Sequence, residues 1–196
     1  VLVDFPIFAV TLLVIFLLLQ EKKWKFALLS GILGGLLFYT YFYYWTFYIV
    51  FIGLLGGLYL IKKDWAMFKK LLLSGFLTIA IGATFFLNSL DTIANQAEIL
   101  RRLNAMLGRS PDWPITIFLV GLVILLMYVQ SKTSKTSENI STEERQTRHY
   151  FLLLLLLASI VIMNVQVIMG YTINPRHWLT TALWPILILT GIYVLK

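Results

Sequence analysis

The chain has 196 residues, of which 60% are hydrophobic and 13% are charged, and its formal net charge is +7. Soluble domains carry about 25% charged and about 45–50% apolar residues, so the composition excludes an ordinary water-soluble domain and indicates a membrane protein. The chain contains no cysteine, which excludes disulfides and cysteine-ligated metal sites.

The first residue is Val1, without a methionine, a basic n-region or a cleavage site. This start differs from a secretory signal peptide. We therefore expect the sequence to be part of a longer protein whose N-terminal part is missing.

Apolar runs separated by charged segments predict the transmembrane helices. A hydrocarbon core about 30 Å thick requires roughly 20 apolar residues, and about 17–25 are tolerated. The uncharged run 26–61 would be about 54 Å long as one helix, so it must fold back, and the aromatic segment 40–46 is the expected turn at the membrane interface. The predicted spans are 5–20, 26–41, 45–61, 71–87, 115–130, 150–169 and 175–195. The predicted fold is an all-α polytopic transmembrane helix bundle of about 7 spans, with 1–196 as a single transmembrane domain.

The basic residues fall mainly on one side of this layout. If 21–25 is cytoplasmic, alternation places 62–70, 131–149 and Lys196 on the same side, and these segments hold 12 of the 16 Lys and Arg. The other side keeps four arginines, Arg101, Arg102, Arg109 and Arg176. This bias follows the positive-inside rule and predicts a multi-pass membrane protein with 21–25 and 131–149 on the cytoplasmic side. Membrane lipid is then the expected partner, and nucleic acid is not.

Two segments between the spans differ in character. Residues 131–149 are rich in Ser, Thr, Glu and Lys and indicate a solvated cytoplasmic linker, in which His149 has no expected role. Residues 88–114 contain apolar side chains at spacings of three and four, namely Ile93, Ala97, Leu100, Leu103 and Leu107. That spacing predicts an amphipathic helix that lies in the outer interface and roofs a cavity between the spans.

No motif of a soluble enzyme is present, and no metal-ligand spacing or cofactor is identified. The glycines of GILGG, from Gly31, and GLLGG, from Gly53, lie within spans and predict close helix packing. The similar strings KFALLSGIL, from Lys25, and KLLLSGFL, from Lys70, are attributed to chance in a leucine-rich chain.

The segment INPRHW, residues 173–178, is the strongest candidate site. Asn174 is a favourable N-cap and Pro175 a favourable first helical residue, so we expect the last span to begin here. Its first turn exposes free N–H groups and the positive end of the helix dipole. Arg176 and His177 would be repelled there unless an anion such as a phosphate is bound. The alternative is interfacial anchoring, with Trp178 in an aromatic belt.

Asn164 and Gln166 lie inside the preceding span, where polar side chains are costly and often functional. Interhelical hydrogen bonding and substrate contact both remain open for them. Arg101 and Arg102 are expected on the phosphate side. Asp4 is the one carboxylate that this layout places on the outer side apart from those in 88–114.

The pattern NVQVIMGYTINPRHW, with GLLFYTYFYYWTFY and KKDW upstream, resembles uncharacterised bacterial multi-pass proteins of the C-type glycosyltransferase (GT-C fold) superfamily, over roughly residues 5–190. The resemblance implies a protein of the bacterial inner (plasma) membrane. It also implies transfer of a sugar from a polyprenyl-phosphate donor on the outer face of that membrane, with Arg176 and His177 holding the lipid-linked phosphate. The family usually has Gly or Asp in place of Arg176. By resemblance, an Asp in the first outer loop would activate the acceptor, and Asp4 is only a stand-in for it.

The candidate substrate-binding residues are therefore Arg176, His177, Trp178, Gln166, Asn164, Arg101 and Arg102. Two other functions remain open: a transporter or flippase for lipid-linked glycans, and a structural membrane subunit without a catalytic site. An outer-loop Asp upstream would favour the enzyme. Inverted repeats with interrupted helices would favour transport.

Overall fold

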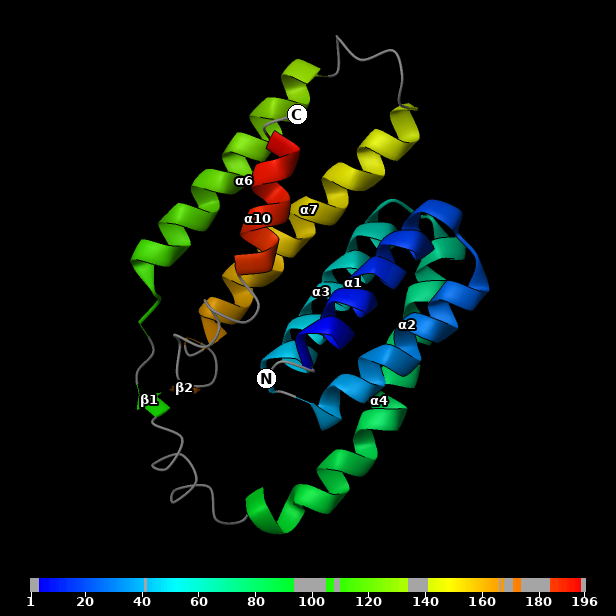
Figure 1. Ribbon diagram of the computed structural model, residues 1–196, viewed down its shortest axis with the longest axis vertical. Coiled ribbons are helices and arrows are strands. Elements are labelled where there is room, and N and C mark those ends of the chain that lie inside the picture. The colour runs from blue at the N-terminus through cyan, green and yellow to red at the C-terminus, as the bar shows by residue number, and fades with distance from the viewer. Residues whose placement is uncertain are drawn as a thin grey trace. The chain divides into compact units, whose positions relative to one another are not determined.

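The computed structural model describes residues 4–40, 42–93, 105–107, 110–133, 141–165, 167, 171–173 and 184–194. Its elements are α1 (Asp4–Glu21), α2 (Trp24–Leu36), the 3-10 helix η1 (Leu37–Tyr39), α3 (Phe42–Ile61), α4 (Trp65–Ile93), β1 (Ala105–Leu107), α6 (Trp113–Thr133), α7 (Thr142–Met163), β2 (Tyr171–Ile173) and α10 (Trp184–Val194). Strands β1 and β2 pair in a two-stranded sheet. The predicted all-α helical bundle is confirmed, and each predicted span overlaps one of the α-helices (Figure 1).

Four helical stretches are long and apolar enough to cross a membrane: Tyr43–Ile61, Trp65–Phe85, Trp113–Ser131 and Thr142–Met163. Phe5–Glu21 and Trp24–Tyr39 are shorter apolar helices. These lengths and compositions support an integral membrane protein, because a stretch of about 20 apolar helical residues matches the hydrocarbon thickness.

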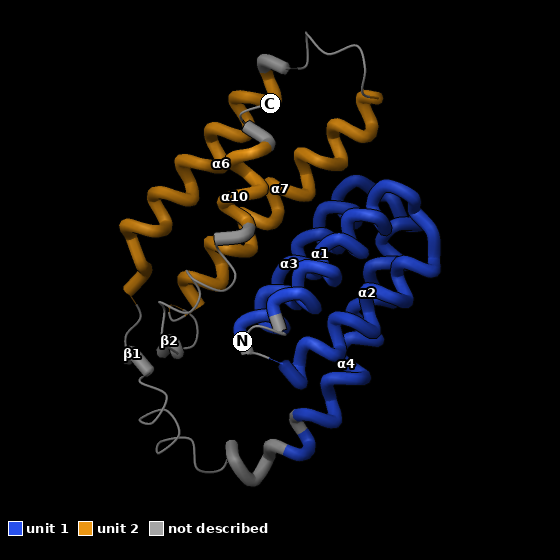
Figure 2. Tube along the Cα trace, in the orientation of Figure 1, with its two compact units in different colours: residues 1–105 blue, residues 106–196 orange. Residues whose placement is uncertain are grey.

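The chain forms two compact units, unit 1 from Val1 to Ala105 and unit 2 from Met106 to Lys196 (Figure 2). Unit 1 contains α1, α2, η1, α3 and α4. Unit 2 contains α6, α7, β2 and α10, and β1 lies at the boundary in sequence. Each unit is described by itself, and the prediction of a single transmembrane domain stays a prediction.

Helices α2 and α4 of unit 1 pack at very short range through glycine. A Cβ on Gly34 would lie 2.4 Å from Tyr48 Cε1 and 2.6 Å from Thr78 Oγ1, and one on Gly31 would lie 2.8 Å from Leu77 Cβ. No side chain fits at either position without moving these neighbours. The close packing predicted for the GILGG glycines is therefore seen. Gly53 and Gly57 of the second glycine group have no such neighbour within 4 Å among the described residues.

The turn predicted in the aromatic segment 40–46 lies at the start of that segment. The chain turns at Thr40, and α3 already begins at Phe42. Tyr43 and Tyr44 are only 3% and 1% exposed, and the Tyr44 ring stacks on Phe8 with centroids 4.8 Å apart. The rest of the segment is helical, because burying these rings against α1 removes a large apolar area from solvent or lipid contact. The interfacial position of the segment stays a prediction.

Residues 88–114 also differ from expectation where they are described. Helix α4 continues through this boundary to Ile93, and Ala105–Leu107 is strand β1, paired with β2. The three residues at the end of the expected amphipathic helix thus form their backbone hydrogen bonds with another strand. Residues 94–104 lie outside the described residues, so the interfacial helix there stays a prediction.

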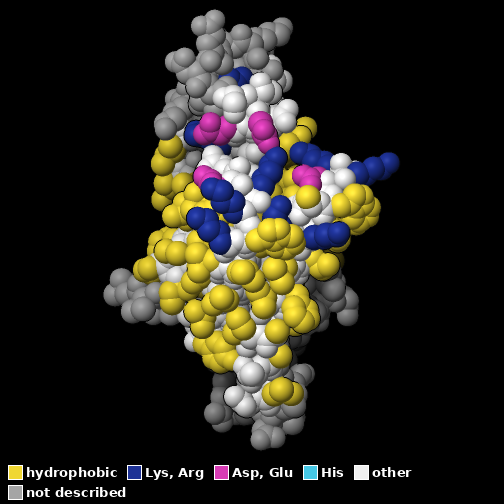
Figure 3. Space-filling view, turned by 90° about the vertical axis from the view of Figure 1, so that its right-hand side faces the viewer, with side chains coloured by type: hydrophobic (Ala, Val, Ile, Leu, Met, Phe, Trp, Pro, Cys, Tyr) yellow, Lys and Arg dark blue, Asp and Glu magenta, His cyan; other side chains and the backbone are white. Residues whose placement is uncertain are grey.

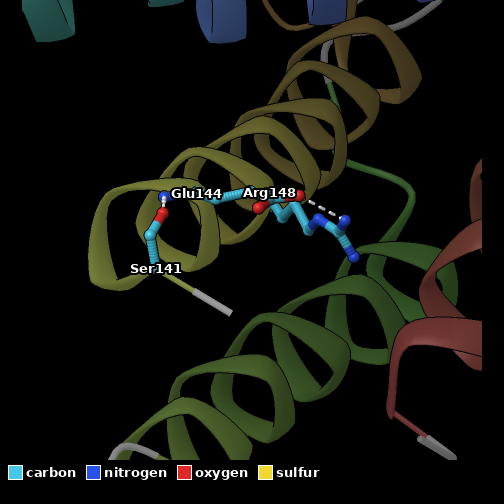
Figure 4. A network of polar contacts seen from close by, with 3 residues as sticks. All are labelled: Ser141, Glu144 and Arg148. Carbon is cyan, nitrogen blue, oxygen red and sulfur yellow. Dashed lines mark hydrogen bonds and ion pairs between the residues drawn. The ribbon is translucent and has the colours of Figure 1, made fainter. Parts of the chain in front are cut away.

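The segment 131–149 is not wholly a linker. Helix α6 continues to Thr133, and α7 begins at Thr142. Ser141 is the N-cap of α7, since its Oγ accepts a hydrogen bond from the Glu144 N–H at 3.2 Å, and Glu144 is bound by Arg148 at 2.5 Å one turn later (Figure 4). The expectation of a linker over 142–149 is therefore wrong, because a capped first turn with Glu143 and Glu144 at its positive end favours the helix.

Candidate functional site

Most residues of the predicted substrate site lie outside the described part of the chain. These are Arg101, Arg102, Gln166, Arg176, His177 and Trp178. Asp4 is the first residue of α1, and its side chain is not among those described. The mutual geometry of these residues therefore stays a prediction, and Asn164 is the candidate whose surroundings can be built from contacts.

Asn164 joins the end of α7 to the start of α6. Its Oδ1 accepts a hydrogen bond from the Asp112 backbone N–H at 3.0 Å, and its Nδ2 donates to Thr116 Oγ1 and to Ile160 O, both at 2.8 Å. Both amide hydrogens are thus used within unit 2. Of the two roles left open for Asn164, interhelical hydrogen bonding is the one that these contacts describe.

The partner of Asn164 is itself a helix start. Asp112 precedes α6, where its Oδ1 lies 3.5 Å from the Ile115 N and its carbonyl accepts from the Thr116 N at 2.9 Å. A carboxylate at this position satisfies free N–H groups of the first turn. The Asn164 amide and the Asp112 cap together fix the spacing of α6 and α7 at this end of unit 2.

A second polar cluster, which sequence reasoning missed, lies inside unit 1. It consists of Ser30 on α2, Tyr48 on α3, and Ser74 and Thr78 on α4, all 0% exposed. The Tyr48 hydroxyl donates to Ser30 O at 2.9 Å and lies 2.9 Å from Ser74 Oγ, which is 2.8 Å from Ser30 Oγ. Thr78 Oγ1 bonds Gly31 O at 3.1 Å and Ser74 O at 2.9 Å.

This cluster, here called the hydroxyl seam, joins α2, α3 and α4 by hydrogen bonds. Each of its hydroxyl groups has a hydrogen-bond partner, as buried polar groups require. The signal that could have found it is the pair of similar strings dismissed as chance. Both contain Leu-Leu-Ser-Gly, and their serines, Ser30 and Ser74, are the two that meet across α2 and α4.

The two turns that connect α1 to α2 and α3 to α4 share an unusual backbone conformation. Lys22 follows α1 with φ 53°, and Lys63 follows α3 with φ 58°. Left-handed backbone at a non-glycine residue costs roughly 1–2 kcal/mol, and glycine is usual after a helix. In each turn an exposed tryptophan, Trp24 or Trp65, then begins the next helix.

Few acidic groups accompany the lysines of these turns. The Lys23 ammonium is 2.6 Å from Glu21 Oε2, and this hydrogen bond, with its charge, lowers the pKa of the Glu21 carboxyl. The Asp64 carboxylate accepts a hydrogen bond from the Met67 N–H at 3.0 Å and so caps α4. Lys70 lies over the Trp24 ring at 5.3 Å, which ties the two turns together.

His149 differs from its expected place in a solvated linker. It lies about two turns inside α7 and is 2% exposed. Its Nδ1 has no hydrogen-bond partner among the described residues, and its ring is 6.0 Å from that of Tyr150. Helix formation from Thr142 onward is what carries this residue into the packed part of α7.

No group of three His, Asp or Glu side chains within the described ranges could hold a metal ion. The chain matches no protein-family model, and comparisons with curated proteins and with solved structures find no match.

Proposed function

We propose that the protein takes part in lipid-linked sugar transfer in a membrane, binding the phosphate of a polyprenyl-phosphate donor through Arg176 and His177. The reaction would move the sugar from this donor to an acceptor on the outer face. Asp4 is the weak candidate base within this chain. This proposal carries forward the GT-C resemblance.

The observation that best supports the proposal is the fixed junction of α6 and α7. Asn164 holds the end of α7 against Asp112 and Thr116, and ten residues later the chain reaches Asn174, the expected start of the last span. Side chains that bind the phosphate of a membrane lipid must be held at the depth of that phosphate, and a rigid neighbouring junction helps to hold them there. The membrane-length helices add the apolar surroundings that a polyprenyl tail needs.

The strand pair offers a second support. β2 ends at Ile173, the first residue of the motif, and β1 begins at Ala105, three residues after Arg102. Because β1 and β2 are hydrogen-bonded, Arg102 and Arg176 are each three residues in sequence from the same strand pair. We therefore expect both arginines to be able to reach one phosphate or diphosphate.

The experiment is a binding measurement in proteoliposomes with a short-chain polyprenyl-phosphate sugar. A charge-assisted hydrogen bond is worth roughly 1.5–3 kcal/mol, so Arg176→Ala and His177→Ala should each weaken binding about tenfold or more. Arg145→Ala, which removes the same charge from the start of α7, should leave binding unchanged.

Two outcomes separate the alternatives. Wild-type affinity in both Arg176→Ala and His177→Ala would overturn the phosphate role and favour interfacial anchoring. Donor binding and translocation without sugar transfer, even with acceptor supplied, would favour the flippase.

A further inference from the structure

The lysine-rich end of unit 1 has a strong net positive charge. The segments 21–25 and 62–70 contain seven lysines, here called the lysine rim: Lys22, Lys23, Lys25, Lys62, Lys63, Lys69 and Lys70. The same segments contain two acidic residues, Glu21 and Asp64, so seven positive charges less two negative ones leave a net five. Both acidic side chains are already engaged, one with Lys23 and the other at the start of α4.

The lysine rim is one surface because α2 and α4 run in parallel. Successive contacts advance along both helices together, from Ser30 with Ser74 to Gly35 with Ile81. Both helices begin at the turns that carry the lysines, and the contact of Lys70 with the Trp24 ring links one turn to the other. Charges that are separate in sequence therefore act on the same region outside the protein.

The surface next to the lysine rim is strongly apolar. On α2, Leu28 is 45% exposed, and on α4, Leu72 and Phe76 are 59% and 67% exposed. Ile61, the last residue of α3, is 81% exposed. All four lie within a few turns of the lysines. Figure 3 shows Lys and Arg side chains beside a broad hydrophobic surface. Trp24 and Trp65, 52% and 56% exposed, stand where charge gives way to hydrophobic surface, which is the position of aromatic residues at a membrane interface.

From this arrangement we infer that the lysine rim binds the headgroups of anionic phospholipids in preference to zwitterionic ones. The apolar flanks require acyl chains, and the phosphate layer of that lipid then lies against the lysine ammonium groups. Basic residues beside a membrane attract anionic lipid at short range. The aliphatic part of a lysine side chain covers apolar surface while its ammonium group reaches the interface. This binding is independent of sugar transfer.

The experiment compares spin-labelled phosphatidylglycerol with phosphatidylcholine of the same chains in proteoliposomes, through the motionally restricted fraction of the electron paramagnetic resonance spectrum. At low salt we expect phosphatidylglycerol to associate about twofold or more strongly. The ratio should fall toward one at 1 M salt, where the Debye length shrinks to about 3 Å. A ratio of one at low salt would overturn the inference from the wild-type protein alone.

A charge-removing variant and a charge-keeping control locate the selectivity. Lys25→Gln with Lys63→Gln, Lys69→Gln and Lys70→Gln should bring the ratio close to one. The four corresponding Lys→Arg changes should keep the wild-type ratio with the same number of altered positions. A wild-type ratio in the Gln variant would assign the selectivity to other basic residues and overturn the inference.

Discussion

Helix α2 of unit 1 and helix α6 of unit 2 are both apolar and both contain glycine, yet they are packed very differently. On α2, a Cβ added to Gly31 or Gly34 would lie closer than 3 Å to a neighbouring atom, whereas one added to Gly121 on α6 would have no neighbour within 4 Å among the described residues. Ile117 and Ile124 of α6 are 67% and 62% exposed. Glycine in an apolar helix therefore does not by itself indicate a packing face.

A hydrogen-bonding residue stands beside the first of the tightly packed glycines of α2. Ser30 precedes Gly31, and its hydroxyl and carbonyl are held by Ser74 and Tyr48. Gly121 lies between Val120 and Leu122, which have no hydrogen-bonding side chain to direct a neighbour. In an apolar environment a hydroxyl favours the helix face where it finds a partner. A serine beside the glycine does not decide the packing, however. Gly75 follows Ser74 and has no neighbour within 4 Å among the described residues, whereas a Cβ on Gly82, which has no serine beside it, would lie 2.6 Å from Phe38 Cδ2. The packing depends on which residue of the neighbouring helix faces the glycine.

The largest expected effect comes from filling the tight position. Gly34→Ala puts a methyl group into Tyr48 and Thr78, and overpacking of this kind destabilises by about 1–3 kcal/mol. Gly121→Ala, the matched change on α6, should be neutral or stabilise by up to about 1 kcal/mol. Thermal unfolding in detergent, followed by tryptophan fluorescence, measures both. Equal midpoints for the two variants would contradict the contrast between α2 and α6.

Asn164→Ala tests the polar junction between α6 and α7 in unit 2. The change leaves the Asp112 N–H and the Thr116 hydroxyl without their present partner, which should destabilise the protein by about 1–2 kcal/mol. Asn88→Ala, at an exposed position of α4, should shift stability by less than about 0.5 kcal/mol. The same unfolding assay applies, and an Asn164→Ala midpoint equal to that of Asn88→Ala would show that the junction contributes nothing.

A smaller effect is expected from the hydroxyl seam. Tyr48→Phe removes the donor to Ser30 O but keeps the ring, and interhelical hydrogen bonds within membranes average about 0.6 kcal/mol. Tyr128→Phe on α6, where the side chain is 58% exposed, is the control. A double-mutant cycle with Ser74→Ala should show coupling, since the two hydroxyls are 2.9 Å apart. Strict additivity would mean that the seam does not act as a unit.

The sequence predicted the helices well and their partners poorly. Long uncharged runs between lysine-rich segments predict spans without any knowledge of tertiary structure. The burial of Tyr44 depends on Phe8, a ring 36 positions earlier in the chain, and composition alone favoured the interface. The α7 start was missed although Ser141 and Glu144 have the spacing of a helix cap, because the surrounding residues have a linker composition.

For the candidate site, sequence reasoning identified Asn164 as a polar residue with two open roles. Choosing between them required the positions of Asp112 and Thr116, which lie 52 and 48 residues away. Ser30 and Ser74 could have been paired from their shared Leu-Leu-Ser-Gly string. The phosphate role of Arg176 and His177 stays a prediction, since both lie outside the described residues.

The distribution of basic residues predicts that the lysine-rich turns and the candidate phosphate site lie on opposite sides of the membrane. Because the chain has no cysteine, Ser137→Cys and Asn104→Cys each introduce a single reactive thiol on a predicted side. Labelling of intact cells or sealed vesicles with an impermeant maleimide should modify Asn104→Cys from outside and Ser137→Cys only after permeabilisation. Modification of both thiols from the same side would contradict the claim.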